Sequence, residues 1–393
     1  MIAVDKFVSA IKESGIDFFT GVPDSLLKSF CAYVTDTCGE NHVIAANEGG
    51  AVGLAAGHYL ATGAPALVYM QNSGQGNAVN PLCSLADPDV YSIPMVLLVG
   101  WRGEPGVKDE PQHVKQGKVT VSLFETLGIP TEVLPDDEKA ALELARKMIE
   151  RAKVESRPVA LIVRKGLFAE YKLQTKRPDI ATLRREDAIQ AILESLGDEA
   201  VVVSTTGMIS REVYEIRERL GQGHEKDFLT VGSMGHAIMI ALGIAQKCTD
   251  GNPNRYVACL DGDGASIMQM GNMAIAGAAH QPNLLHFVLN NAAHDSVGGQ
   301  PTVGSEIDLA KIAEACGYYV ADKFEGGQIE DLKAMLRERI DQAIYSWACD
   351  GDDVQTTFFE IKVAKGARKD LGRPKEPPQV NKALYMKTLG AGE

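Results

Sequence analysis

The chain has 393 residues, of which 45% are hydrophobic and 23% charged, and it carries a formal net charge of −13. This composition excludes a disordered or fibrous chain, because such chains lack the apolar residues that build a core. The acidic excess argues against a general binder of nucleic acid or anionic membranes, whose affinity depends on lysine and arginine. At roughly 100–200 residues per domain, the length predicts two domains.

The number and spacing of the cysteines and the hydropathy of the chain indicate its cellular compartment. The seven cysteines are scattered and form no CxxC pair, so neither a disulfide framework nor a structural zinc site is indicated. No apolar stretch approaches the roughly 20 residues that cross a bilayer. The N-terminal sequence MIAVDKFVSAIKESG is typical of an amphipathic helix and lacks the pattern of a secretion signal. We therefore expect a cytoplasmic protein with no membrane partner.

In the first half, short β-rich runs alternate with helical patterns, which is typical of βαβ units and a parallel sheet covered on both faces. A first helix carries Phe7, Val8 and Ile11 on one face and can end at Gly15. Further helices are expected from about Leu26, over Glu48–Ala61, before Met95 and over Glu138–Lys153. Strands are expected at Ile16–Phe19, His42–Ala46, Ala66–Met70, Met95–Gly100, Thr131–Leu134 and Val159–Val163.

The same alternation restarts after a polar, proline-containing segment at residues 173–183, which we expect to be a linker. Strands are expected at Ala200–Ser204, Asp227–Val231, Arg255–Leu260, Asn283–Leu289 and Thr357–Val363. Helices fit Ser210–Leu220, Gly235–Lys247, Ala265–Ala278, Leu309–Cys316 and Ile329–Ile344. We therefore predict two similar α/β domains at 1–172 and 184–365, followed by a C-terminal tail at 366–393 that is expected to fray.

Two turns in the second half carry the strongest chemical signal. Gly262-Asp263-Gly264 follows one strand, and Asn290-Asn291 follows the next strand 25 residues later. Because parallel strands end at the same sheet edge, these groups should meet there. A carboxylate and an amide oxygen suit Mg²⁺, while Gly264 and the helix from Ala265 can approach a diphosphate. Either turn alone would more simply be a strand-to-helix connection; the pair predicts a metal–diphosphate site.

This pair of motifs resembles that of thiamine diphosphate-dependent 2-oxo acid decarboxylases, and nearly the whole chain is similar to that family. The phosphonopyruvate and sulfopyruvate decarboxylases are its closest branches, with two domains and no middle domain. The resemblance implies a pyrimidine-binding domain followed by a diphosphate-binding domain, with thiamine diphosphate and Mg²⁺ as cofactors. Asp263, Asn291 and the main-chain carbonyl of Ala293 match the metal ligands.

Other positions match the family's cofactor contacts. Glu48, in Asn47-Glu48-Gly49-Gly50, matches the glutamate that contacts the aminopyrimidine ring and so promotes loss of the thiazolium C2 proton; taken alone, it is equally a first-turn helix glutamate. Met234 matches the apolar residue that holds the cofactor bent, although a core methionine is the alternative. Remaining contacts are expected from Thr206, Gly207, Ser233, Gly262, Gly264 and Ala265.

Candidates for substrate chemistry are Asp24, His113 and His294, each of which could instead be a structural hydrogen bonder. Asp24 resembles an acidic residue that follows GxP in these decarboxylases, and a histidine at position 113 suits proton transfer. Val297 stands where pyruvate decarboxylases carry a catalytic glutamate, so simple pyruvate chemistry is not expected.

A phosphonate or sulfonate on the substrate needs a cation with aligned donors. Arg102 follows a strand end and precedes what we expect to be a long loop bearing His113, Lys115 and Lys118; Arg211 is the second candidate. The leading reaction is decarboxylation of 3-phosphonopyruvate to phosphonoacetaldehyde and CO₂ by a homodimer or higher homo-oligomer, because relatives place the cofactor between two subunits. Sulfopyruvate decarboxylation is the near alternative, and a carboligase or a non-catalytic paralogue the more distant ones.

Overall fold

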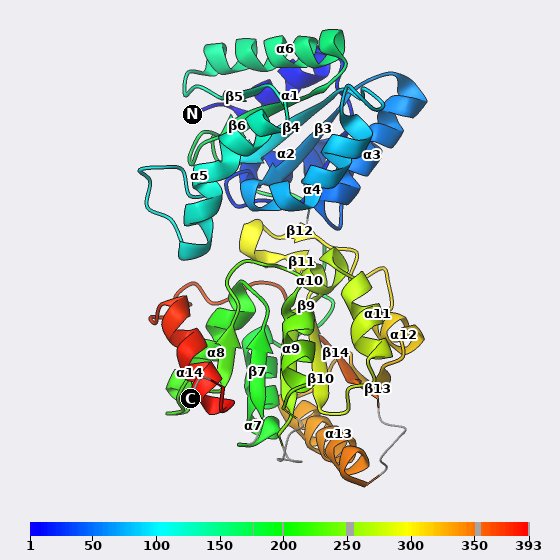
Figure 1. The fold of residues 1–393 in the computed structure, drawn as a ribbon, viewed down its shortest axis with the longest axis vertical. Helices are drawn as coiled ribbons and strands as arrows, with labels where there is room; N and C mark the ends of the chain where they lie inside the picture. The colour runs from blue at the N-terminus through cyan, green and yellow to red at the C-terminus, as the bar shows by residue number, and fades with distance from the viewer. Residues whose placement is uncertain (176, 199, 249–254, 350–354, 392–393) are drawn as a thin grey trace. The chain divides into compact units, whose positions relative to one another are not determined.

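The chain forms two α/β units in a computed structural model that describes all residues except 176, 199, 249–254, 350–354 and 392–393 (Figure 1). The first domain comprises Met1–Lys176 with Ser296–Gln300, and the second comprises Arg177–Asp295 with Pro301–Glu393. The division falls within the segment 173–183. Among the described residues, no helix combines the length and the apolar character needed to cross a membrane.

The first domain is built on a six-stranded parallel sheet whose order is β2-β1-β3-β4-β6-β5. Its strands are β1 (Phe19–Gly21), β2 (His42–Ile44), β3 (Ala66–Gln71), β4 (Met95–Gly100), β5 (Thr131–Val133) and β6 (Pro158–Val163). Its helices are α1 (Val4–Glu13), α2 (Lys28–Thr37), α3 (Glu48–Thr62), α4 (Gln75–Pro81), α5 (Pro111–Thr126) and α6 (Glu138–Glu155), with single turns η1 (Gly39–Asn41), η2 (Asn72–Gly74) and η3 (Leu82–Ala86).

A second six-stranded parallel sheet, ordered β13-β14-β10-β9-β7-β8, forms the centre of the second domain. Its strands are β7 (Val201–Ser204), β8 (Asp227–Leu229), β9 (Val257–Gly262), β10 (Leu284–Asn290), β13 (Tyr319–Phe324) and β14 (Thr357–Lys362). The helices are α7 (Arg185–Leu196), α8 (Met208–Arg219), α9 (Ala237–Ala245), α10 (Asp263–Met268), α11 (Gly271–Ala278), α12 (Leu309–Ala315), α13 (Ile329–Cys349) and α14 (Pro378–Thr388). Short segments β11 (Ala293–His294), η4 (Asp295–Val297) and β12 (Gln300–Pro301) follow β10.

Both sheets have the same topology. When the strands of each sheet are numbered along the chain, both orders read 2-1-3-4-6-5. In such sheets ligands bind beyond the carboxyl ends of the strands, where the strand order reverses. That point lies between β1 and β3 in the first domain and between β7 and β9 in the second. The expectation of two similar parallel-sheet domains is confirmed.

Alternate residues of the central strands pack on opposite faces, as burial on both sides of a parallel sheet requires. In β3, Leu67 and Tyr69 join one apolar cluster, whereas Val68 and Met70 join the other. The strands of the second domain divide in the same way, with Leu260 on one face and Cys259 on the opposite face. These two-layer cores hold the strand ends in fixed positions.

Several expected elements differ from the structure. The predicted helix Ala265–Ala278 is two helices, because Gln269 leaves the helical region (φ −129°, ψ 49°) and Asn272 donates a side-chain hydrogen bond to the carbonyl of Gly235 at 2.9 Å. His113 lies on α5 and not on a long loop, since Pro111 begins a helix there.

The C-terminal segment also departs from its expected fraying. It contains α14, whose Tyr385 is buried in the core of the second domain. Asn381 ties the helix to β8 by accepting a hydrogen bond from the amide of Leu229 and donating one to the carbonyl of Asp227. The sequence did not predict this helix, because its apolar periodicity is weak: Tyr385 is the one buried residue of α14 among those described.

Candidate active site

The two sequence motifs of the second domain lie side by side. Strands β9 and β10 are parallel neighbours, with Gly262 in register with Leu289. Directly beyond them, the amide of Asn291 donates a hydrogen bond to Oδ1 of Asp263 at 3.4 Å. The convergence of the two turns, expected from their spacing, is therefore present in the fold.

Asp263 is a carboxylate buried at the first turn of α10, with 2% of its surface exposed. Burial raises its pKa to about 6, although a hydrogen bond from the hydroxyl of Thr302 opposes that shift. Gly304 keeps the space beside it open, since a Cβ there would lie 2.7 Å from both Asp263 Oδ2 and Asn290 Oδ1. A buried carboxylate that faces such a space fits a hard divalent cation, which would remove the cost of its charge.

The two asparagines at the end of β10 differ in the hydrogen-bonding capacity that remains for a ligand. Asn290 is fully buried and donates its side-chain amide to the carbonyl of Gly304 at 2.7 Å and to Glu360 at 2.9 Å. In Asn291, Oδ1 accepts only from the amide of Ala293 at 3.0 Å among the described residues, so one lone pair remains. Asn291 is thus the better oxygen donor of the two.

Neighbouring strand ends supply the rest of this sheet edge. Gly207 caps α8 with φ +107°, and Thr206 Oγ1 accepts a hydrogen bond from the amide of Gly232 at 3.0 Å. The turn at Ser233 and Met234 therefore lies against the turn after β7. Met234 is half-buried and does not belong to the apolar core of the described residues, which argues against the core-methionine alternative.

His294 lies against the Gly264 turn. A Cβ at position 264 would come within 3.2 Å of the imidazole, so any larger residue there would push the ring aside by a few tenths of an ångström. Burial lowers the pKa of His294 to about 4, which makes the ring neutral at neutral pH. The predicted closeness of His294 to the metal turn is met by the structure, while its chemical role stays a prediction.

In the first domain, Glu48 begins α3 and has 4% of its surface exposed. Asn77 donates its side-chain amide to Oε2 at 2.7 Å, and burial raises the pKa of the carboxyl above its usual range. A Cβ on Gly74 would lie 2.1 Å from Oε1, so a glycine is required beside it. A raised pKa and a space kept open by glycine suit a carboxyl group that shares a proton with a ring nitrogen.

Asp24 is fully buried between the end of β1 and Gly100 of β4. Its Oδ2 accepts hydrogen bonds from the amides of Leu26 at 2.9 Å and Leu27 at 3.3 Å. Oδ1 has no hydrogen-bond partner in the described structure, and burial raises the pKa to about 6 despite the opposing charge of Arg102. Asp24 therefore exchanges its proton closer to neutral pH than an ordinary aspartate does.

Arg102 is held within the protein by Asp109. Its Nε and Nη2 donate to the two carboxylate oxygens at 2.8 and 2.5 Å, while Nη1 donates to the hydroxyl of Ser25 at 2.9 Å. His113 faces this pair: burial, followed by the charge of Arg102, lowers its pKa to about 4. At neutral pH His113 is therefore a neutral imidazole, so Asp24, whose pKa is raised to about 6, is better suited than His113 to give up a proton near neutral pH.

Arg211 has a different environment. It lies in the first turn of α8, is half-buried, and has no ion pair or hydrogen bond among the described residues. Burial alone accounts for the lowering of its pKa. A half-buried cation without a carboxylate partner favours an anionic ligand. Arg211 and Arg102 therefore both remain candidates for binding the acid group of the substrate.

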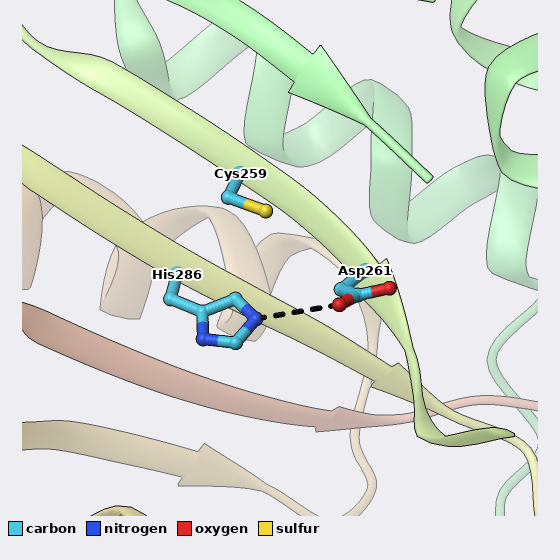
Figure 2. A group of neighbouring side chains, drawn as sticks. All are labelled: Cys259, Asp261 and His286. Carbon is cyan, nitrogen blue, oxygen red and sulfur yellow. Dashed lines mark ion pairs between the residues drawn. The ribbon is translucent and has the colours of Figure 1, made fainter. Parts of the chain in front are cut away.

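A third group of polar side chains lies in the core of the second domain, on β9 and β10 (Figure 2). His286 Nε2 is 3.8 Å from Asp261 Oδ2, and Cys259 lies beside them; all three are fully buried. Burial raises the pKa of the Cys259 thiol well above its usual range. The His286 ring packs against the aromatic rings of Tyr318 and Phe358, and Cys259 belongs to the same apolar cluster, so this group lies in the core of the second domain.

Sequence reasoning missed the residues that support the candidates. Asn77, Asp109, Thr302 and Asp295 each make a hydrogen bond to a predicted site residue. Asn77 and Thr302 lie 29 and 39 residues from their partners, and no spacing rule connects them. Asp295, four residues after Asn291, and Asp109, seven residues after Arg102, are the two acidic residues that lie close in sequence to their partners.

Comparison with known proteins gives consistent matches to both domains. Residues 1–123 match the thiamine pyrophosphate enzyme, N-terminal TPP binding domain, and residues 203–346 match the corresponding C-terminal TPP binding domain. Phosphonopyruvate decarboxylase of Streptomyces hygroscopicus is 34% identical, over 96% of this chain and 92% of its own. The Streptomyces viridochromogenes protein of that name is 33% identical with the same coverage. Sulfopyruvate decarboxylase of Methanosarcina acetivorans is 30% identical, over 80% of this chain and 82% of its own.

The raised pKa of Asp24 predicts a specific dependence of stability on pH. Because the folded-state pKa of about 6 exceeds the ordinary value of 3.8, the folded protein binds more protons than the unfolded chain between these pH values. The Asp24 contribution is therefore fully present below pH 4 and is lost as the pH rises through 6. Asp24→Asn should be the more stable protein at pH 7, by up to about 3 kcal/mol, and the difference should vanish near pH 4.

Calorimetric unfolding of both proteins between pH 4 and pH 7 measures this difference. Asp36→Asn is the matched control, because the amides of Gln174 and Thr175 bind Asp36 and its pKa is lowered in spite of partial burial. That variant should lose stability at neutral pH, the opposite sign. A wild-type protein that gains stability over Asp24→Asn as the pH rises would contradict the assignment.

Proposed function

The chain belongs to the thiamine pyrophosphate enzyme family, and from this premise we propose that it is a decarboxylase of 3-phosphonopyruvate that releases phosphonoacetaldehyde and CO₂. One observation carries the choice of substrate: two phosphonopyruvate decarboxylases align with 96% of this chain at 34% and 33% identity. The matches to both thiamine pyrophosphate domains support thiamine diphosphate as the cofactor.

The edge of the second sheet would hold the diphosphate end of the cofactor. We assign Mg²⁺ to Asp263, Asn291 and the carbonyl of Ala293, because this set offers the carboxylate and carbonyl oxygens that Mg²⁺ prefers. The main-chain and side-chain groups next to them would contact the cofactor: Thr206, Gly207, Ser233, Met234, Gly262, Gly264 and Ala265. The raised pKa of buried Asp263 supports the assignment, since a cation there stabilises its ionised form.

Glu48 would act on the pyrimidine end. When bound, thiamine diphosphate supplies a carbon nucleophile and an electron sink for the pair left by departing CO₂. The Glu48 carboxyl, buried and held by Asn77, is suited to exchange a proton with a ring nitrogen while Gly74 leaves room beside it. Its low exposure excludes water from the shared proton.

Proton transfer to the product would involve Asp24, His113 and His294. Asp24 is the strongest acid–base candidate, because its pKa of about 6 lies nearer the working pH. His113 and His294, with pKa values of about 4, would act as neutral imidazoles that orient the substrate by hydrogen bonds. Nδ1 of His113 has no hydrogen-bond partner in the described structure and is available for this purpose.

Sulfopyruvate decarboxylation remains the second candidate. The sulfopyruvate decarboxylase of Methanococcus maripaludis has separate subunits beta and alpha, which match 40% and 42% of this chain. The Methanosarcina acetivorans protein matches 80% of this chain within a single chain, so the number of chains does not discriminate between the two substrates. Charge does discriminate between them, because a phosphonate can carry a second negative charge, whereas a sulfonate carries one.

We also propose a homodimer or a higher homo-oligomer, and a cytoplasmic location stays a prediction of the sequence.

Turnover of a series of 3-substituted pyruvates tests the proposal. We expect release of CO₂ and phosphonoacetaldehyde from 3-phosphonopyruvate, dependent on thiamine diphosphate and Mg²⁺. Its kcat/KM should exceed those for sulfopyruvate and pyruvate by at least about tenfold, equivalent to about 1.4 kcal/mol. Higher activity on sulfopyruvate would support the second candidate, and no turnover of any 2-oxo acid would contradict a decarboxylase.

Two variants in the same assay identify the cation that holds the acid group. If Arg102 has this role, Arg102→Ala should raise KM for 3-phosphonopyruvate by at least about tenfold and leave slow pyruvate turnover almost unchanged. Equal losses on both substrates would identify Arg102 as structural through its pair with Asp109. Arg211→Ala is the matched comparison, and a selective loss there would assign the role to the arginine of α8.

Glu48→Gln separates proton exchange from cofactor binding. The variant keeps the volume of the side chain and its hydrogen bond with Asn77, so it should fold and bind thiamine diphosphate. An amide cannot share a proton with the ring nitrogen, so exchange of the C2 hydrogen of bound cofactor for deuterium should slow by at least about a hundredfold. NMR of quenched samples measures that rate. An exchange rate equal to that of the wild type would show that another group is responsible.

A further inference from the structure

The side chain of Asn291 is oriented by an acidic residue in its own turn. Its Nδ2 donates a hydrogen bond to Oδ2 of Asp295 at 2.7 Å. A carboxylate only accepts hydrogen bonds, so it accepts the NH₂ end of the amide and repels the carbonyl end. Asp295 therefore fixes Oδ1 of Asn291 on the opposite side, which is the atom we assign to the metal.

Asp295 is in turn held by a buried arginine from α7. Nη1 of Arg185 donates to Oδ2 of Asp295 at 2.7 Å, and the amide of Gly366 donates to the same oxygen at 2.9 Å. Arg185 has 5% of its surface exposed. Three donors thus converge on one carboxylate oxygen, which leaves Asp295 little freedom to rotate.

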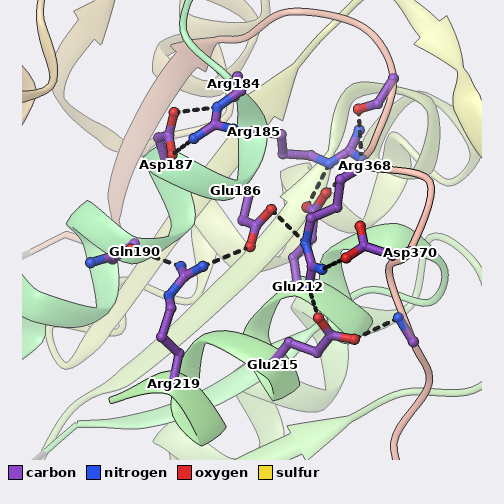
Figure 3. A network of polar contacts seen from close by, with 12 residues as sticks. Arg184, Arg185, Glu186, Asp187, Gln190, Glu212, Glu215, Arg219, Arg368 and Asp370 are labelled. Atoms are coloured by element: carbon purple, nitrogen blue, oxygen red, sulfur yellow. Dashed lines mark hydrogen bonds and ion pairs between the residues drawn. The ribbon is translucent and has the colours of Figure 1, made fainter.

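The guanidinium of Arg185 is fixed from the other side by Glu212 of α8 (Figure 3). Nε and Nη2 donate to the two carboxylate oxygens of Glu212 at 2.8 and 3.0 Å, and Nη2 also reaches the carbonyl of Gly366 at 3.2 Å. Glu212 is 2% exposed. This planar fork binds two carboxylates at once, an arrangement that the single ammonium group of lysine cannot reproduce.

We propose that Arg185 and Asp295 are positioning residues that set the orientation of Asn291 for the metal, a role that rests on the proposed function. In this role they act through the amide of Asn291 and need no contact with substrate or cofactor. Outer hydrogen bonds of this kind typically change metal affinity by about 10- to 100-fold. Without either group the Asn291 amide can rotate. Metal binding must then restrict that rotation, which weakens the affinity for the metal.

The second domain offers a matched control for the loss of a buried ion pair. Arg217 of α8 donates to both carboxylate oxygens of Asp227, with Nη2 to Oδ1 at 2.9 Å and Nε to Oδ2 at 3.1 Å. Both residues are buried, and Arg217 makes no contact with Asn291 or Asp295 among the hydrogen bonds of the described residues. Removal of either arginine should lower the melting temperature, but only Arg185 should affect the metal.

The experiment measures Mn²⁺ affinity in the presence of saturating thiamine diphosphate, from the EPR signal of free Mn²⁺, together with the melting temperature of each metal-free protein. We expect Arg185→Met and Asp295→Asn to weaken Mn²⁺ binding by at least about tenfold. Arg185→Lys should recover part of the melting temperature but little of the affinity. Arg217→Met should keep wild-type affinity within about threefold in spite of its lower melting temperature.

Asp295→Asn keeps the proposal falsifiable if Arg185→Met does not fold, because it retains the shape of the side chain and removes only the acceptor-only carboxylate. Wild-type Mn²⁺ affinity in a folded Asp295→Asn or Arg185→Met protein would overturn the positioning role. Equal losses of affinity in Arg185→Met and Arg217→Met would also overturn it, because a general loss of stability would then be the cause. A wild-type protein that binds no Mn²⁺ with thiamine diphosphate would overturn the metal assignment itself.

Discussion

A carboxylate buried beside the end of a β-strand must be hydrogen-bonded, protonated or joined to a cation, and each domain holds such a group where we place the cofactor. In the first domain it is Glu48, whose partner is an uncharged amide and whose pKa is raised. In the second it is Asp263, held by a hydroxyl and a main-chain amide. Neither carboxylate forms an ion pair with a described residue, so both remain able to interact with a ligand. The shared strand order 2-1-3-4-6-5 brings these groups to equivalent sheet edges.

Much of the fold was predictable because its signals are local. The strand Met95–Gly100 agrees with its predicted bounds, and the start of α3 at Glu48 follows from the capping Asn47. Residues that act through distant partners were not predictable. Arg185 reaches Asp295 across 110 residues, and no periodicity or motif relates the two positions. The break after α10 escaped prediction for the same reason, since its cause is a contact with the loop at Gly235.

In this acidic chain, most of the buried or half-buried arginines discussed above form ion pairs with carboxylates of the protein. Arg102, Arg185 and Arg217 each have a carboxylate partner that compensates the guanidinium charge. An anionic substrate that approaches such an arginine competes with an internal carboxylate, so selectivity would depend on rearrangement of the pair. Arg211 has no such partner in the described structure, and an anion there would gain attraction without breaking an ion pair. Binding of an anionic substrate would therefore be opposed by an existing ion pair at Arg102 but not at Arg211.

We propose that the Asp263 and Asn291 turns form one metal–diphosphate site. A crystal structure of the protein with thiamine diphosphate and Mn²⁺, recorded at the Mn absorption edge, tests it most directly. We expect an anomalous peak about 2.2 Å from a carboxylate oxygen of Asp263, Oδ1 of Asn291 and the carbonyl oxygen of Ala293, with the diphosphate bound to the same ion. A peak bound elsewhere, or a diphosphate away from these turns, would contradict it.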